Sequence, residues 1–262
     1  MEVDVLAVSR YPGFADRLAA NEELWTPGKP AGLWVPKLVI DDALGAAAQI
    51  SYTVPAGKIA LLTGVRAFNV SGGTSLLTIY LVPSGGAAGV TNRWWNAVSL
   101  GAGVAAGTGA FAVLSAGDTI QALSSVAGAI NFSPVIHEAK AADLPNLVPL
   151  NLAGISSAAD TLAYTCPANR YAVPWGAWGA SLNVGCGIAS VQGGVAGSLS
   201  MKASTDAGVT KPLLTSLSVG LNLGANLNPA IVPALEPGHR LYFTASAATA
   251  LNIWAAYELL EV

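Results

Sequence analysis

The feature that most constrains the fold of this chain is an internal repeat, because landmarks of the first half return in the same order in the second half. Residues 50–56 read ISYTVPA, and residues 162–168 read LAYTCPA. Residues 114–120 read LSAGDTI, and residues 235–241 read LEPGHRL. We therefore expect the chain to fold as two copies of one module.

The spacing of the landmarks sets the limits of the two modules. Glu138 follows Gly117 by 21 residues, and Glu258 follows Gly238 by 20, so these glutamates are interpreted as equivalent closing residues. The second copy carries about nine extra residues, which we expect in loops. The predicted organisation is an N-terminal arm at 1–44, module one at 45–140, an extended linker at 141–154 and module two at 155–262.

Each module is expected to consist of β-strands. Residues 50–54 and 251–257 alternate apolar with small or polar side chains, which is the period of a half-buried strand. Residues 76–82 are almost continuously apolar, as in a central strand. Segments rich in Gly, Pro and Ser separate these runs and predict turns. The predicted fold is all-β, with two tandem antiparallel β-sandwiches of jelly-roll type preceded by an extended N-terminal arm.

The chain is unusually poor in charged side chains. Asp, Glu, Lys and Arg make up 10% of its 262 residues, whereas about 25% is typical of soluble proteins. Between residues 45 and 135 the charged residues are Lys58, Arg66, Arg93 and Asp118. That number is too small to coat an isolated domain with the mixed charges that favour solubility. We therefore expect much of this surface to face other protein.

Other classes of partner are not expected. The uncharged stretches 94–117 and 171–201 are broken by Gly, Ser and Asn, so neither predicts a membrane-spanning helix. The net charge is -3 and no basic run occurs, which argues against nucleic acid as a partner. The acidic N-terminus is not followed by an apolar run, so we expect synthesis in a cytoplasm without a secretory signal.

The N-terminal arm differs from both modules in composition. Residues 1–44 contain 11 charged residues and several prolines. A short helix from about residue 14 to 25 would place apolar side chains on one side. An arm with aromatic anchors and too little sequence for its own core is expected to pack on its own modules or on a neighbouring subunit. The candidate assembly contacts are Phe14, Leu18, Trp25 and Trp34.

Motifs for catalysis, cofactors or metals were not found, and we expect the chain not to be an enzyme. His137 and His239 are the two histidines, neither in a nucleophile-elbow context, and no phosphate-binding loop occurs. Two cysteines and two separated histidines do not make a metal site. Cys166 and Cys186 are interpreted as small buried apolar residues, although a disulfide between them stays open. We predict no catalytic, cofactor-binding or metal-binding residues and no cofactor.

The acidic residues have a structural interpretation that competes with a catalytic one. Glu138 and Glu258 are expected to make the same contact in each module. Asp118 and His239 share one repeat position, so a polar turn residue explains both. A weaker alternative is a carbohydrate-active enzyme that uses Glu138, Glu258 or Asp118.

Tryptophans supply a further hypothesis, that of exposed aromatic platforms for sugars. Packing in the core or in a subunit interface is the favoured alternative. The candidate glycan platform consists of Trp94, Trp95, Trp175 and Trp178.

The order of the landmarks in module one resembles small β-modules of tailed-bacteriophage virion proteins. It comprises YTVPAGK at 52–58, Asn69 near a glycine turn, LSAGDTI at 114–120 and the closing Glu138. Module two matches only in part, since Asn169 and His239 replace the Gly and the Asp of the two turns.

This resemblance implies a non-enzymatic virion protein, synthesised in the host cytoplasm. The favoured role is a capsid decoration (cement) protein that binds the head surface as a symmetric oligomer, a homotrimer or homodimer. It would contact the major capsid protein or other virion proteins. The alternative is a tail-fibre or receptor-binding module that recognises host-surface glycan.

Overall fold

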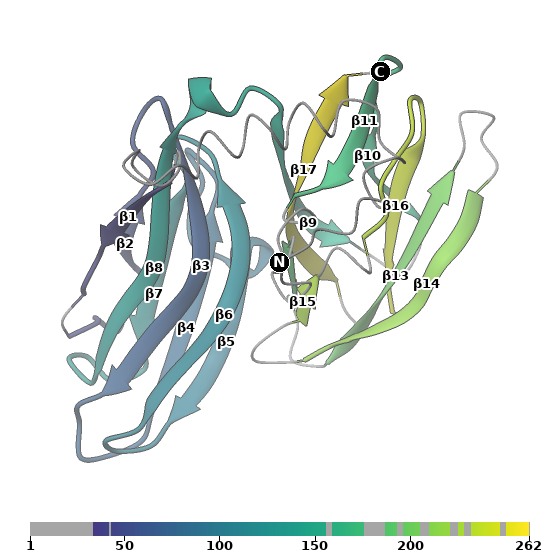
Figure 1. Ribbon diagram of the computed structural model, residues 1–262. Helices are drawn as coiled ribbons and strands as arrows, with labels where there is room; N and C mark the ends of the chain where they lie inside the picture. Colours follow the sequence, from purple (N-terminus) through teal and green to yellow (C-terminus); the bar gives the residue numbers. More distant parts are fainter. Residues whose placement is uncertain are drawn as a thin grey trace, which may run out of the picture.

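The computed structural model describes residues 34–261 except residue 42 and the segments 156–158, 176–186, 193–195, 205–209, 221–224, 228–231 and 247–249. The described elements are β-strands and two short 3-10 turns, η2 (Val90–Asn92) and η3 (Ala141–Asp143). Figure 1 shows two β-sandwiches side by side, module one in purple to teal and module two in teal to yellow. The predicted all-β fold of two tandem antiparallel sandwiches is confirmed.

Module one is a jelly roll made of two four-stranded antiparallel sheets. The first sheet contains, in spatial order, β1 (Val35–Leu38), β8 (Ile130–Lys140), β3 (Lys58–Asn69) and β6 (Ala105–Leu114). The second contains β2 (Gln49–Thr53), β7 (Thr119–Ser124), β4 (Ser75–Val82) and β5 (Arg93–Leu100). The predicted central strand is β4, which pairs with β7 on one side and β5 on the other.

Module two repeats this topology strand for strand. One sheet contains β10 (Thr161–Thr165), β16 (Arg240–Ala245), β13 (Gly197–Ser204) and β14 (Thr210–Val219), in the places of β2, β7, β4 and β5. The other contains β9 (Leu147–Ile155), β17 (Leu251–Glu261), β11 (Arg170–Pro174), β12 (Gly187–Val191) and β15 (Ala225–Leu227). Because β11 and β12 pair with successive halves of β17, together they take the place of β3.

The extra sequence of module two lies between β11 and β12, the two strands that together take the place of β3. In module one, two residues separate Leu62 and Val65, whose partners on β8 are Ile136 and Pro134. In module two, the equivalent residues of β17 are Tyr257 and Ala255, which pair with Pro174 and Gly187. Residues 175–186 lie between these two in the sequence. The insertion thus falls at the position where module one has a β-bulge, between Leu62 and Gly64.

The turns confirm the repeat at the level of hydrogen bonds. The amide of Gly117 donates to the carbonyl of Val54 at 2.9 Å, and that of Gly238 donates to Cys166 at 3.1 Å. Both glycines have a positive φ, 85° and 77°, a conformation that glycine adopts without steric cost. These corners reverse the chain before β7 and β16, as the sequence predicted.

The equivalence of Glu138 and Glu258 is wrong by one residue. Glu138 lies opposite Ala60, and the matching residue of β11, Ala172, lies opposite Leu259. A slip of one residue turns a side chain to the other face of a strand. The two glutamates therefore cannot make the same contact.

The module boundaries also differ from the prediction. β1 lies within the predicted arm yet belongs to the first sheet of module one, and β9 lies within the predicted linker yet belongs to module two. The reason is that β8 and β17 would otherwise leave a row of backbone groups unpaired. Module one therefore begins at Val35, and residues 141–146 form the link between the modules.

Each module has its own apolar core between its two sheets. Module one buries Leu62, Leu77 and Ile79 completely, and module two buries Leu241 and Phe243 completely. Removing one such side chain from water contributes about 1.5–3 kcal/mol.

Candidate assembly surfaces

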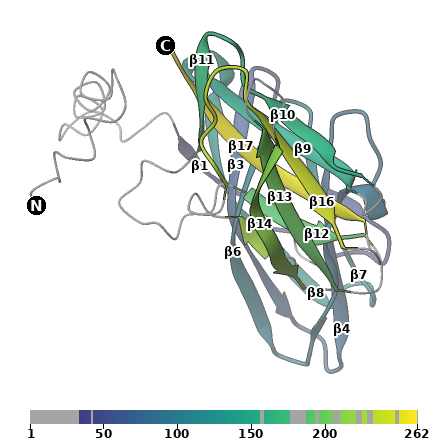
Figure 2. The same ribbon diagram turned by 90° about the vertical axis from the view of Figure 1, so that its right-hand side faces the viewer.

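The two modules are joined by a buried contact. The sheet of β17, β12 and β15 in module two faces the β5 and β6 side of module one (Figures 1 and 2). Ile188 and Trp254 are 1% and 3% exposed and belong to the same apolar cluster as the core of module one. Module two thus covers an edge of module one with the outer face of one of its sheets.

A buried polar network crosses this contact. Asn252, which is fully buried, donates to the carbonyl of Val90 at 2.9 Å and accepts from the side chain of Gln192 at 2.6 Å. The hydroxyl of Ser190 donates to the carbonyl of Arg93 at 2.6 Å, and the Arg93 guanidinium donates to the carbonyl of Gln192. Because buried polar groups are costly when unpaired, this network fixes how the modules meet.

Trp94 and Trp95 lie in β5 and are both buried, at 3% and 1% exposure. Strict alternation would have left one of them at the surface. However, the pairing with β4 shifts between Ile79 and Tyr80, which inserts one extra residue into β5 and breaks the alternation. Neither ring offers a face to solvent, so the glycan-platform hypothesis is wrong for this pair.

Trp34 and Trp175 pack against each other with their ring centroids 5.6 Å apart in an edge-to-face arrangement. Both lie against a cluster that contains residues of module one, such as Leu61, and of module two, such as Leu147. Trp34 therefore contacts its own chain. The other predicted site residues, Phe14, Leu18, Trp25 and Trp178, lie outside the described residues.

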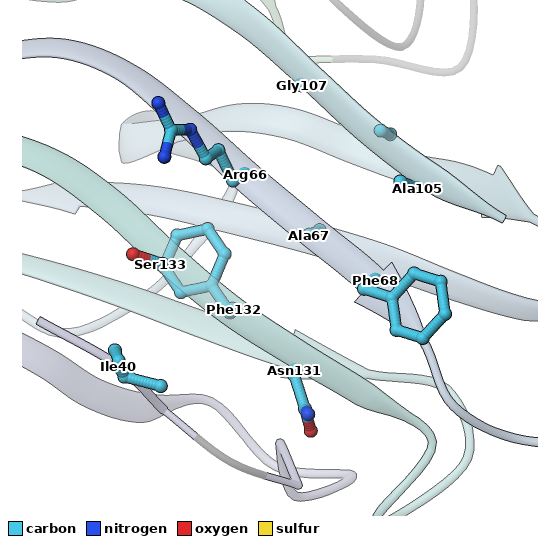
Figure 3. A pocket seen from close by; sticks show the side chains of 10 residues that line it. Ile40, Arg66, Ala67, Phe68, Ala105, Gly107, Asn131, Phe132 and Ser133 are labelled. Carbon is cyan, nitrogen blue, oxygen red and sulfur yellow. The ribbon is translucent and has the colours of Figure 1, made fainter. Parts of the chain in front are cut away.

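The described residues leave open the outer face of the first sheet of module one, and Figure 3 shows the side chains of β3, β6 and β8 that lie there. It holds a shallow groove of about 430 Å³ floored by small residues such as Ala105 and Gly107. Ile40 and Phe68 border it with exposed fractions of 59% and 43%. Arg66 is the charged residue of the lining.

The loop end of module one, where the loops after β3, before β6 and before β8 meet, is apolar and without charge. The amide of Asn69 donates to the carbonyl of Val104, and that of Val70 donates to Ala129, so three loops are held together. Val70, Val104 and Val126 are 49%, 45% and 50% exposed. No Asp, Glu, Lys or Arg occurs in residues 67–92, 94–117 or 119–137. Such a surface is typical of a contact with other protein.

Asp118 and Glu138, two of the three acidic residues named in the catalytic alternative, make hydrogen bonds within the scaffold. The carboxylate of Asp118 accepts from the amides of Ser84 and Ser115 at 2.9 and 2.8 Å, which joins two turns. Glu138 accepts a hydrogen bond from the Tyr52 hydroxyl at 3.0 Å. Burial, followed by this bond and the charge of Glu138, raises the pKa of Tyr52. His239 lies 3.7 Å from the Glu236 carboxylate in the equivalent turn.

Within the part of the chain that the structure describes, no group of three or more His, Cys, Asp or Glu residues is placed to hold a metal. The buried thiol of Cys166 is free and lies 3.1 Å from the carbonyl of Arg170, and burial raises its pKa. Cys186 lies outside the described residues. Among the described residues no helix is long and apolar enough to span a membrane.

The sequence prediction missed the residues of the module contact, although the sequence carried a signal for one side of it. Residues 89–101 read GVTNRWWNAVSLG, and residues 208–220 read GVTKPLLTSLSVG. The first of these segments forms η2 and β5, against which module two packs. The second contains β14.

Comparison with known proteins finds distant structural likenesses. No protein-family model and no curated protein sequence matches the chain. Solved structures that it resembles include the STIV MCP, a capsid protein of Sulfolobus Turreted Icosahedral Virus, at a TM-score of 0.31 and 8% identity over 88% of this chain and 98% of that one. Another is the tandem CBM22 domain from Paenibacillus barcinonensis Xyn10C, at a TM-score of 0.25 and 9% identity over 87% and 91%.

A third likeness is to the PBSX exported protein XepA, at a TM-score of 0.24 and 12% identity over 88% of this chain and 89% of that one. The chain is thus distantly similar in structure to viral capsid proteins among others.

Proposed function

We propose that the protein is a non-enzymatic structural component of a virion that assembles with copies of itself. Its specific role in this proposal is that of a capsid decoration (cement) protein on the head surface. The observation that carries the proposal is the distribution of exposed apolar side chains. Among the described residues, ten of the eleven large hydrophobic side chains that are exposed belong to module one or its first strand.

This distribution argues for permanent protein contacts. Monomeric soluble proteins rarely expose a contiguous apolar patch of more than a few hundred Å². Here the loop end of module one and the groove near Phe68 are apolar and lie next to each other along β3. A surface of this kind becomes soluble when like subunits or a shell protein cover it.

Binding of host-surface glycan has weaker support. Trp94 and Trp95 are buried, and Trp175 packs on Trp34. Trp178, the fourth residue of the candidate platform, lies outside the described residues. The catalytic alternative is equally weak, since Asp118 and Glu138 are engaged in structural hydrogen bonds.

The first experiment measures the protein on its own and on particles. We expect the purified chain to be an oligomer by size exclusion with light scattering at micromolar concentration. On heads that lack the protein, we expect it to bind in many copies and to raise the temperature at which the heads break, because a ligand of the assembled state stabilises that state.

Each alternative predicts a different outcome of this experiment. A receptor-binding protein would adhere to host cells and block infection when added free, without stabilising heads. Absence of the chain from purified particles of the virus that encodes it would reject a virion role.

A further inference from the structure

We infer that the open face of module one, defined by Arg66, Phe68, Asn131 and Ser133, docks onto the β14 edge of a second copy of the chain. This contact would repeat between chains the contact that module two makes on β5 within the chain. The inference rests on the self-assembly proposed above and names the surfaces that carry it.

The open face of module one is the structural equivalent of the face that module two buries. Phe68 lies opposite Asn131 in the pairing of β3 with β8, and Ser190 lies opposite Asn252 in the pairing of β12 with β17. One step along, the pairs are Asn69 with Ile130 in module one and Val191 with Leu251 in module two.

A shared hydrogen bond confirms the equivalence of the two asparagines. The side-chain oxygen of Asn131 accepts from the amide of Ala43 at 3.0 Å, and that of Asn252 accepts from the amide of Gly154 at 3.4 Å. Ala43 and Gly154 share a positive φ, 61° and 72°. The same local structure thus supports both faces.

The two faces differ in whether they are covered. Ser190 and Asn252 are 1% and 0% exposed because module one covers them. Phe68 is 43% exposed and borders the open groove. Module one therefore presents one half of a contact whose other half is not supplied by the described residues of its own chain.

The missing half is present on module two. In module one, β4 pairs with β5 through Ile79 with Trp95 and then Tyr80 with Arg93, leaving one extra residue in β5. In module two, β13 pairs with β14 through Met201 with Leu214 and then Lys202 with Pro212, with the same extra residue. Pro212 of β14 therefore stands where Arg93 stands in β5.

Side-chain size fits this pairing of surfaces. Within the chain, the small Ser190 lies directly on the carbonyl of Arg93. Between chains, the large Phe68 would replace Ser190 and the smaller, exposed Pro212 would replace Arg93. The larger Phe68 on the docking face would thus meet the smaller Pro212 on the β14 edge, so that this pair fills a space similar to that of Ser190 and Arg93.

The resulting contact is head to tail, because it joins the open face of module one in one copy to the β14 edge of module two in the next copy. Contacts of this type close into rings when the rotation between subunits permits it. A small closed oligomer would cover both the groove of each module one and the edge of each module two.

The first test is a disulfide between chains. Ser190 contacts Arg93 directly, so the equivalent pair is Phe68 of one copy and Pro212 of another. We expect the full-length double variant Phe68→Cys with Pro212→Cys to form covalent oligomers on mild oxidation, seen on a non-reducing gel. Each single variant serves as the control and should stay at the monomer position of 26.4 kDa. Oligomers in the single variants, or none in the double variant, would overturn the inference.

The second test uses charge in place of a new thiol. We expect Phe68→Glu to raise the dissociation constant of the oligomer at least about tenfold by light scattering, since a buried charge without a partner weakens an interface strongly. The matched control is Ile50→Glu, an exposed apolar residue of β2 (59% exposed) away from this face, which should leave the oligomer intact. Circular dichroism checks that both variants are folded.

The outcomes separate this inference from the proposed function. If the wild-type chain is an oligomer that Phe68→Glu leaves unchanged, the proposed docking face is wrong while a virion role stands. The same result would follow if the chain's own N-terminal segment, or another protein, covers the groove. If the chain binds particles only as a monomer and the double cysteine variant gives no covalent oligomer, the inference fails without loss of the decoration role.

Discussion

Ala43 and Gly154 are equivalent residues that differ in conformational cost. Both have a positive φ, yet alanine pays about 1–2 kcal/mol in this region because its Cβ approaches the carbonyl oxygen. Each amide donates to the asparagine that shapes the outer face of its module. The strain at Ala43 is therefore retained at the edge of the groove, where the backbone must follow the same path as in module two.

A pair of substitutions tests this account. We expect Ala43→Gly to raise the free energy of unfolding by about 0.5–1 kcal/mol, because relief of strain exceeds the entropy cost of glycine. Gly154→Ala should lower it by a similar amount, since a Cβ there would meet Gln192 at an ordinary 3.7 Å and the cost comes from the backbone alone. Urea unfolding of both variants measures the effect. A loss of stability in Ala43→Gly would contradict it.

At the scale of elements, the sequence predicted the strands and corners that depend on local chemistry. The alternation at 50–54 appears as β2, the run at 76–82 as β4, and the Gly117 and Gly238 corners as turns with equivalent hydrogen bonds. The sequence alignment of the two closing strands is one residue out because each has a glutamate near its end. Only the pairing with β3 and β11 reveals that Leu259 is the true equivalent of Glu138.

The burial of the candidate site residues could not be predicted in the same way. Packing in the core or in an interface was the favoured expectation for Trp94 and Trp95, and both rings are buried. The alternation within a single strand does not show the cause, because it reveals neither the bulge in β5 nor the second module packed on that edge. The recurrence of GVTN and GVTK at 89–92 and 208–211 was a readable signal. The two segments mark equivalent edges, β5 of module one and β14 of module two. Module two packs on the first edge, whereas no described residue of module one packs on the second.

The polar network between the modules gives a prediction at the element scale. We expect Asn252→Ala to lower the free energy of unfolding by about 2–3 kcal/mol. The substitution removes the hydrogen bonds of Asn252 to the carbonyl of Val90 and to the side chain of Gln192 in the contact between the modules. Gln121→Ala is the control, since that half-buried amide donates to a neighbouring threonine of the same strand. Its effect should stay within about 0.5 kcal/mol by urea unfolding. Equal effects of the two changes would count against a structural role for the network.

At the scale of the whole molecule, the two modules share one buried cluster, because Ile188 and Trp254 join the core of module one. The modules should therefore unfold together. We expect a single calorimetric transition whose calorimetric and van't Hoff enthalpies agree. Two resolved transitions would mean that the contact is too weak to couple the modules and that the chain behaves as two independent domains.

The interrupted strand of module two has a practical consequence. β17 pairs with β11 before residues 175–186 and with β12 after them, and both pairings belong to one sheet. Module one makes the same step with two residues between Leu62 and Val65. The fold has thus accepted a change of length in mid-sheet, which makes this junction a natural place to splice in a peptide tag or display epitope.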